Sequence, residues 1–77
     1  MPNQNEIREA VLQSVRKIMK EPNANLADDT PFAQMDLDSL DRMSVMVEVE
    51  NLLNVDLNDS SPEQFRSISD YIKFLQT

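Results

Sequence analysis

The sequence contains no cysteine, no histidine and no glycine. The absence of cysteine rules out a disulfide framework and a thiolate metal site. The absence of histidine removes the commonest catalytic base and the commonest transition-metal ligand. We therefore expect a protein that is not an enzyme and holds no metal cofactor. Without glycine, asparagine and aspartate must supply any left-handed turn conformations.

Long apolar runs are also absent. No run approaches the roughly 20 residues that a membrane-spanning helix needs. The N-terminal residues MPNQN show neither the basic region nor the apolar region of a secretory signal. We therefore expect a cytoplasmic chain that does not insert into membranes.

Positive charge is scarce, since 14 acidic residues face 7 basic ones and give a net charge of −7. Such a chain is repelled by nucleic-acid phosphates and by anionic membrane surfaces. The charge favours partners with basic patches, although acidity also serves solubility alone, and composition leaves both interpretations open. The 77 residues are enough for one small domain, 1–77, which we expect to be a monomer.

The first helix is predicted over about residues 3–20. Asn3 or Asn5 can cap its start, and Pro22 cannot continue the hydrogen-bond ladder beyond its end. Its apolar residues recur at helical spacing and form one stripe: Ile7, Val11, Val15 and Ile18.

Residues 21–38 form a long, polar connection interrupted by two prolines. Leu26, Phe32 and Met35 are its expected anchors, and one short helical turn is expected near Phe32. A connection of this length would let the next helix run roughly parallel to the first, whereas a short link would force the opposite.

The second helix is predicted over about residues 39–53, with apolar residues in two stripes. The broader stripe would meet the core and contains Val45, Met46, Val49, Leu52 and Leu53. The narrower stripe contains Leu40, Met43 and Val47. Either both stripes belong to one wide buried face, or the narrower one is an exposed ridge within a charged rim, as a docking surface requires.

The C-terminal part predicts two further helices. Ser61 begins a capping box that is followed by a short helix through Phe65. Ser67 or Ser69 can cap a last helix of about 8 residues, too short to be stable without packing. No segment shows a convincing strand pattern. The sequence thus predicts an all-α fold, a small four-helix bundle of three main helices and one short one, with a long loop between the first two.

Asp38-Ser39-Leu40 stands where the second helix should start. Aspartate and serine are common helix caps, and an Asp-Ser pair before an apolar run usually serves only to cap the helix that follows. A serine there also lies beside unpaired backbone N–H groups and the positive end of the helix dipole. A phosphate linked through oxygen is well accommodated in such a place.

These residues resemble the acyl carrier protein family, with Phe32 upstream of the motif and an apolar series downstream: Val45, Val49, Leu53 and Leu57. The resemblance implies that Ser39 carries a covalent 4′-phosphopantetheine arm, transferred from coenzyme A by a separate phosphopantetheinyl transferase. The thiol of the arm would hold an acyl group as a thioester. Asp38 would orient the start of the helix, and Leu40 would lie beside the attachment point.

The resemblance also implies a surface that meets other enzymes: the transferase, and acyltransferases, synthases or ligases with basic docking patches. The expected partner-facing residues are Asp36, Asp41, Met43, Val47, Glu48 and Glu50. Two positions depart from the family pattern, which commonly has glycine where this chain has Asp36 and an acidic residue where it has Ser44. The departures favour a specialised carrier over the housekeeping carrier of fatty acid synthesis.

Other interpretations stay open. One is a carrier of amino acids for peptide synthesis or for D-alanylation of the cell wall, and another is an unmodified acidic helical interaction module. The spacing of Asp36 and Asp38 resembles a calcium loop, but Asp41 stands where that loop needs glycine. Loose association of divalent cations with the acidic clusters remains a hypothesis.

Overall fold

The computed structural model describes residues 2–76, which form three α-helices and two 3₁₀ turns. Within that range no strand occurs, and the all-α prediction is confirmed. The expected short fourth helix is a single 3₁₀ turn, and a second 3₁₀ turn forms in the long connection. In chain order the elements are α1 (Gln4–Met19), η1 (Phe32–Met35), α2 (Ser39–Leu53), η2 (Pro62–Gln64) and α3 (Ile68–Leu75).

The ends of α1 follow from its flanking residues. The Asn3 side chain accepts a hydrogen bond from the Glu6 backbone N–H at 2.8 Å, and the Glu6 carboxylate accepts one from the Asn3 N–H at 2.9 Å. This reciprocal capping box satisfies two N–H groups that would otherwise lack partners. Lys20 ends the helix in the left-handed conformation, with φ 58°, in the absence of any glycine.

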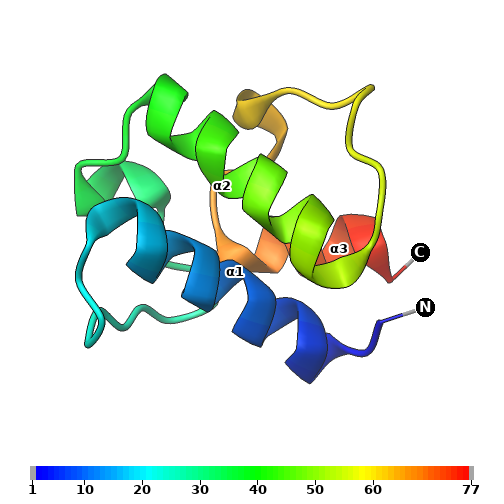
Figure 1. Cartoon of the computed structure of the whole chain (residues 1–77), viewed down its shortest axis with the longest axis horizontal. Helices are drawn as coiled ribbons and strands as arrows, with labels where there is room; N and C mark the ends of the chain where they lie inside the picture. The colour runs from blue at the N-terminus through cyan, green and yellow to red at the C-terminus, as the bar shows by residue number, and fades with distance from the viewer. Residues whose placement is uncertain (1, 77) are drawn as a thin grey trace.

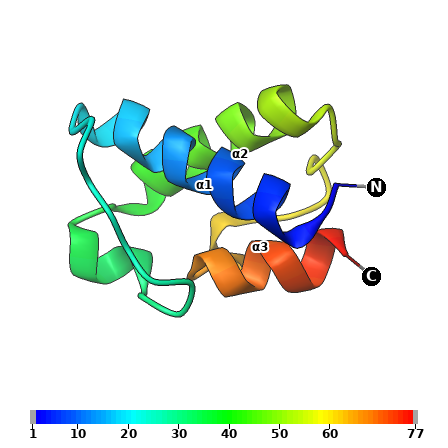
Figure 2. The ribbon, with the colours of Figure 1, turned by 90° about the horizontal axis from the view of Figure 1, so that it is seen from below.

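The helices do not run in the expected directions. Figures 1 and 2 show that α1 and α2 are antiparallel, while α3 runs the same way as α2. A shallow surface hollow agrees, because it brings Glu6 and Glu9, at the start of α1, beside Leu52 and Leu53 at the end of α2. The expectation of a parallel pair was therefore wrong.

The route of the connection explains the antiparallel pair. The Phe32 N–H donates to the Arg66 carbonyl at 2.8 Å, and the Ser69 N–H donates to the Asp28 carbonyl at 2.8 Å. These bonds tie the connection to the segment that starts α3. Residues 21–38 run from the end of α1 to the start of α3 and then back to the end of the bundle where α1 stops (Figure 2). The long connection therefore lets α2 start beside the end of α1.

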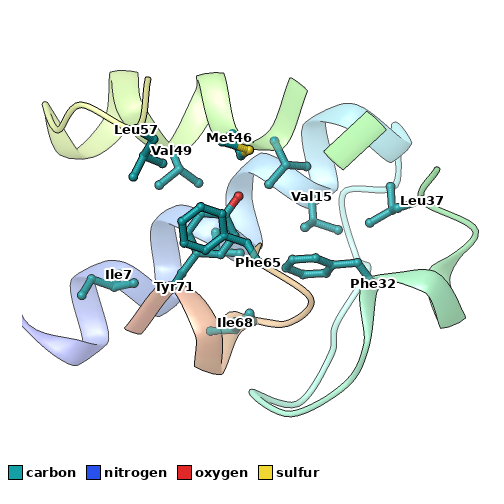
Figure 3. Packing of buried hydrophobic residues seen from close by; sticks show 12 residues of the cluster. Ile7, Val15, Phe32, Leu37, Met46, Val49, Leu57, Phe65, Ile68 and Tyr71 are labelled. Atoms are coloured by element: carbon teal, nitrogen blue, oxygen red, sulfur yellow. The ribbon is translucent and has the colours of Figure 1, made fainter. Parts of the chain in front are cut away.

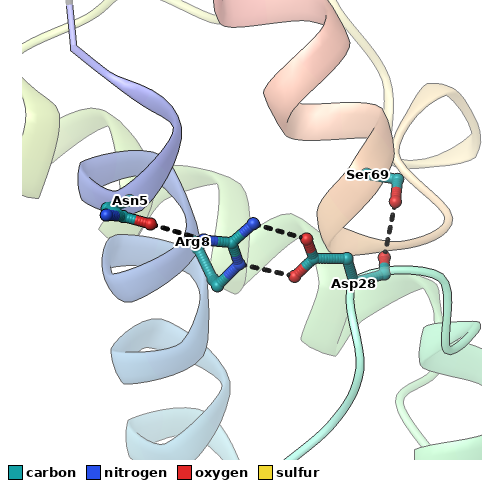
Figure 4. A network of polar contacts seen from close by, with 4 residues as sticks. All are labelled: Asn5, Arg8, Asp28 and Ser69. Atoms are coloured by element: carbon teal, nitrogen blue, oxygen red, sulfur yellow. Dashed lines mark hydrogen bonds and ion pairs between the residues drawn. The ribbon is translucent and has the colours of Figure 1, made fainter.

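Asp28 also joins the connection to α1 (Figure 4). Its carboxylate accepts two hydrogen bonds from the Arg8 guanidinium, each at 2.7 Å, and Arg8 donates a third to Asn5. The bonds from Arg8 hold the pKa of the Asp28 carboxyl below its usual value, although partial burial opposes the shift. One aspartate thus contacts α1 through its side chain and Ser69 of α3 through its carbonyl.

Aromatic rings fill the centre of the bundle. The Tyr71 ring stacks on the Phe65 ring, with the ring centroids 4.3 Å apart and the ring planes at 10° to each other. The centroid of the Phe32 ring lies 6.2 Å from that of Tyr71. Figure 3 shows the Tyr71 hydroxyl pointing from α3 toward α2. Three members of the predicted α1 stripe are in this core, which consists of Ile7, Val11, Val15, Phe32, Leu37, Val45, Met46, Val49, Leu57, Phe65, Ile68 and Tyr71.

Most of the broader apolar stripe of α2 is buried, as predicted, but one of its residues is exposed. Val45, Met46 and Val49 are buried, but the Leu52 residue, expected in the core, is 50% exposed. The surface of α1 beside Leu52 is mostly polar, with Glu6, Glu9 and Gln13 around Ala10, so α1 offers Leu52 little apolar surface. None of the helices in residues 2–76 combines the length and the apolar character needed to cross a membrane.

Candidate functional site

The turn before α2 is built around Asp36, which ends η1 in the left-handed conformation with φ 60° and ψ 27°. Its N–H donates to the Phe32 and Ala33 carbonyls. The next side chain, Leu37, is buried in the core, and its N–H donates to the Phe32 carbonyl at 3.4 Å. Because Leu37 points inward, the residues that follow it begin α2 at the surface.

Asp38 caps α2. Its backbone is extended, and its carboxylate accepts a hydrogen bond from the Asp41 N–H at 2.9 Å. Ser39 is the first residue within the helix, and it is exposed. The cap is therefore supplied by Asp38, which leaves the Ser39 hydroxyl free of that role.

Arg42 contacts this start of α2 from one turn further along. Its Nη2 donates to the Ser39 Oγ and its Nε donates to the Asp38 carbonyl, both at 3.4 Å. The sequence reasoning did not single out Arg42. The available signal was its spacing, because residues three apart on a helix are neighbours on its surface.

An apolar ridge follows Ser39 along the outside of α2. Leu40, Met43 and Val47 are 72%, 51% and 49% exposed, which decides for the exposed ridge over one wide buried face. The ridge borders a groove of about 250 Å³ between α2 and the η2 segment. That groove is lined by Met43, Met46, Val47, Glu50, Leu57, Asn58, Ser60 and Pro62.

The acidic residues near the ridge fall into two groups. Asp36 and Asp41 flank Ser39 in sequence, the first exposed and the second partly buried. Glu48 instead pairs with Lys17 of α1 at 3.1 Å, and Glu50 accepts a hydrogen bond from the Leu57 N–H at 2.8 Å. Both glutamates thus hold contacts within the fold, and their predicted role in partner binding stays a prediction.

Residues 2–76 bring no three carboxylates close enough together to hold a metal ion. What the start of α2 offers is an exposed hydroxyl at the first position of the helix, with a guanidinium beside it. Such a hydroxyl can accept a phosphate-linked group, because N–H groups at the helix start and the cation both favour negative charge. The residues present therefore fit a phosphodiester substituent on Ser39.

Comparisons with known proteins agree with this chemistry. A family model described as "Phosphopantetheine attachment site" matches residues 9–75. The chain is also similar to an acyl carrier protein of Phytoplasma australiense, with 32% identity over 40 residues. The aligned part covers 52% of this chain and 53% of that relative, so the match spans about half of each protein. No solved structure matches the chain.

Proposed function

The chain belongs to the phosphopantetheine attachment-site family, and from this premise we propose that it is an acyl carrier with Ser39 as its attachment residue. The prosthetic group of the family is covalent 4′-phosphopantetheine. When attached, that group supplies a thiol that holds an acyl cargo as a thioester for delivery to partner enzymes. Carriers of this family are generally not catalysts, and the cargo here would come from fatty acid, lipid or specialised acyl biosynthesis.

The observation that carries this proposal is that Asp38, and not Ser39, supplies the cap of α2. Asp38 caps α2, so the exposed Ser39 hydroxyl is not needed to hold the helix together. In the modification, Ser39 Oγ loses its proton and gains a bond to the pantetheine-side phosphorus of coenzyme A. The pyrophosphate link breaks, and adenosine 3′,5′-bisphosphate leaves. The base would come from a separate phosphopantetheinyl transferase, since this chain has no histidine.

The surface beside Ser39 supports binding to other enzymes. Leu40, Met43 and Val47 supply exposed apolar contacts, and Asp36 and Asp41 supply negative charge that steers basic patches toward them. The transferase and acyl-handling acyltransferases, synthases or ligases are the proposed partners of a cytoplasmic, monomeric carrier.

A specialised pathway fits this surface better than the housekeeping one. Asp36 adopts the left-handed conformation at a position where the family commonly has glycine. Ser44 stands where the family commonly has an acidic residue, and its hydroxyl donates to the Leu40 carbonyl at 3.2 Å. Partners of the generic carrier would therefore meet an added charge before Ser39 and a missing one after it.

The test is intact mass after incubation with coenzyme A and a broad-specificity phosphopantetheinyl transferase. Wild type and the matched control Ser44→Ala, altered on the same helix, are expected to gain one phosphopantetheine. Ser39→Ala is expected to gain none. If wild type gains nothing while its circular dichroism spectrum is helical, the carrier proposal fails and the unmodified interaction module takes its place.

A further inference from the structure

Arg42 is the one basic residue of α2, whose other charged residues are Asp41, Glu48 and Glu50. It lies three residues after Ser39 and therefore on the same side of the helix. Its Nη2 is 3.4 Å from the Ser39 Oγ, the atom proposed to carry the prosthetic group. A cation is thus held beside the attachment point on an otherwise acidic helix.

The contacts of Arg42 are unusual for a cation among carboxylates. Asp36, Asp38 and Asp41 all lie within six residues of it, yet neither ion pair found within residues 2–76 involves Arg42. Its guanidinium donates instead to a hydroxyl and a carbonyl, both at 3.4 Å. Bonds of that length are at the weak end of the range, so the guanidinium can exchange them for a stronger acceptor.

We propose that Arg42 binds the phosphodiester that joins the prosthetic group to Ser39, an inference that rests on the proposed function. A phosphodiester on Ser39 Oγ has two non-bridging oxygens, which share one negative charge and lie two bonds away from the atom that Arg42 already contacts. The planar guanidinium matches a pair of phosphate oxygens, and its hydrogen bonds to a charged acceptor are stronger than those to a hydroxyl. Attachment therefore replaces a weak acceptor with a strong one.

Charge balance gives Arg42 a second effect. The phosphodiester adds a negative charge next to Asp38 and near Asp36 and Asp41, which would repel it. The guanidinium offsets that repulsion and fixes the first atoms of the arm against α2. Because the site is exposed, high salt is expected to weaken the interaction.

The experiment compares wild type with Arg42→Gln, Arg42→Lys and the matched control Arg66→Gln. Arg66 is exposed and precedes α3, outside α2, so its substitution makes the same charge change on a different element from the one that carries Ser39. Each protein is converted to the phosphopantetheine form, and intact mass verifies the conversion. Phosphorus NMR then reports on the phosphodiester, and nitrogen–proton NMR of the arginine Nε–H groups reports on Arg42.

We expect the Arg42 Nε–H signal of wild type to shift when the unmodified protein is converted, and the shift to shrink at high salt. The phosphorus signal of Arg42→Gln should differ from that of wild type, while Arg66→Gln should match wild type. Arg42→Lys should lie between them, because lysine keeps the charge and loses the planar fork.

Two results would overturn the inference, and they are distinguishable. If all variants are modified, an unchanged Arg42 Nε–H signal together with identical phosphorus signals removes Arg42 from the phosphodiester and leaves the carrier function intact. If wild type is not modified at all, the mass measurement overturns the proposed function and this inference with it.

Discussion

At the residue scale, Asp36 has a measurable conformational cost. Its φ of 60° places a residue with a Cβ in the left-handed region, where an L-amino acid is disfavoured by about 1 kcal/mol or more and glycine is not. We expect Asp36→Gly to raise the free energy of unfolding by roughly 0.5–1 kcal/mol, because the greater freedom of glycine in the unfolded chain cancels part of the gain. Urea unfolding measures the change.

Asp36→Asn separates conformation from charge. Asparagine tolerates the left-handed region about as well as aspartate and removes the same negative charge. A gain shared by both variants is therefore electrostatic. A glycine variant no more stable than the asparagine variant would contradict the conformational explanation.

Residue by residue, the start of α2 was more predictable than its surroundings. Asp38 and Ser39 could be recognised because cap residues and helical spacing are local features of the chain. The contacts of Arg42 could not, since nothing in the sequence decides whether its guanidinium meets a carboxylate or the Ser39 hydroxyl. The same holds for Glu50, which looks solvent-facing in sequence and binds the Leu57 N–H in the fold.

At the scale of elements, Asp28 links α1, the connection and α3, and its lowered pKa makes that link sensitive to pH. The folded state favours the ionised carboxylate, so the contribution is full above the pKa of the unfolded chain, about 3.9. This contribution to the free energy of unfolding is lost as the pH falls from about 3.9 through the lower pKa that Asp28 has in the folded protein. We expect Asp28→Asn to be less stable than wild type at pH 7, with the difference closing under acid.

Denaturant midpoints at pH 7 and at pH 3 or below measure this difference. Asp29→Asn is the control, because it removes the neighbouring carboxylate, which is exposed and forms no ion pair with Arg8. A deficit of Asp28→Asn that stays constant across the acid range would contradict the linkage.

Tyr71 of α3 makes the stability of the fold depend on pH in the alkaline range. Burial raises the pKa of its hydroxyl well above the usual value, and the Glu50 carboxylate adds to the shift. The folded state therefore holds the proton while the unfolded chain releases it above about pH 10, so stability is full below that pH and falls above it. The loss reaches at most about 1.4 kcal/mol per pH unit.

Tyr71→Phe removes this titration and keeps the ring that stacks on Phe65. The stability of wild type minus that of the variant should decline between pH 10 and 11.5, and the subtraction removes every effect of pH that the two proteins share. A difference that does not change with pH would show that the hydroxyl titrates equally in the folded and unfolded chains.

Element boundaries followed from the sequence, whereas element directions did not. Asn3, Asp38 and Ser67 precede the three helices. The predicted bounds of α1 and α2 agree with the structure to within one residue, and α3 has the expected length of 8 residues. The antiparallel course of α2 depends on the hydrogen bond between Phe32 and Arg66, which are distant in sequence. The exposure of Leu52 depends on that same course.

At the scale of the whole molecule, the net charge of −7 is held within extents of 28 × 23 × 21 Å. The screening length is about 30 Å at 0.01 M salt and about 3 Å at 1 M, so at low salt every charge interacts with every other. Self-repulsion destabilises the folded state under those conditions. The two ion pairs described, Arg8–Asp28 and Lys17–Glu48, also weaken with salt, but exposed pairs contribute little.

We therefore expect sodium chloride to stabilise the protein between 0.01 and 0.5 M. A gain of about 1 kcal/mol corresponds to a melting temperature higher by roughly 4–8 °C in a domain of this size. Asp59→Asn, which removes one exposed charge, should melt higher at low salt and respond less to added salt. A melting temperature that falls with salt would mean that ion pairs outweigh the net repulsion.

Magnesium or calcium chloride at matched ionic strength tests whether cations also associate with the acidic clusters. Within residues 2–76 no three carboxylates converge on one point, so association would be loose and spread over the surface. A divalent ion would still gather beside neighbouring carboxylates such as Asp36 and Asp38 more strongly than sodium does. We expect the divalent salt to raise the melting temperature further, and equal shifts in the two salts would leave screening as the whole effect.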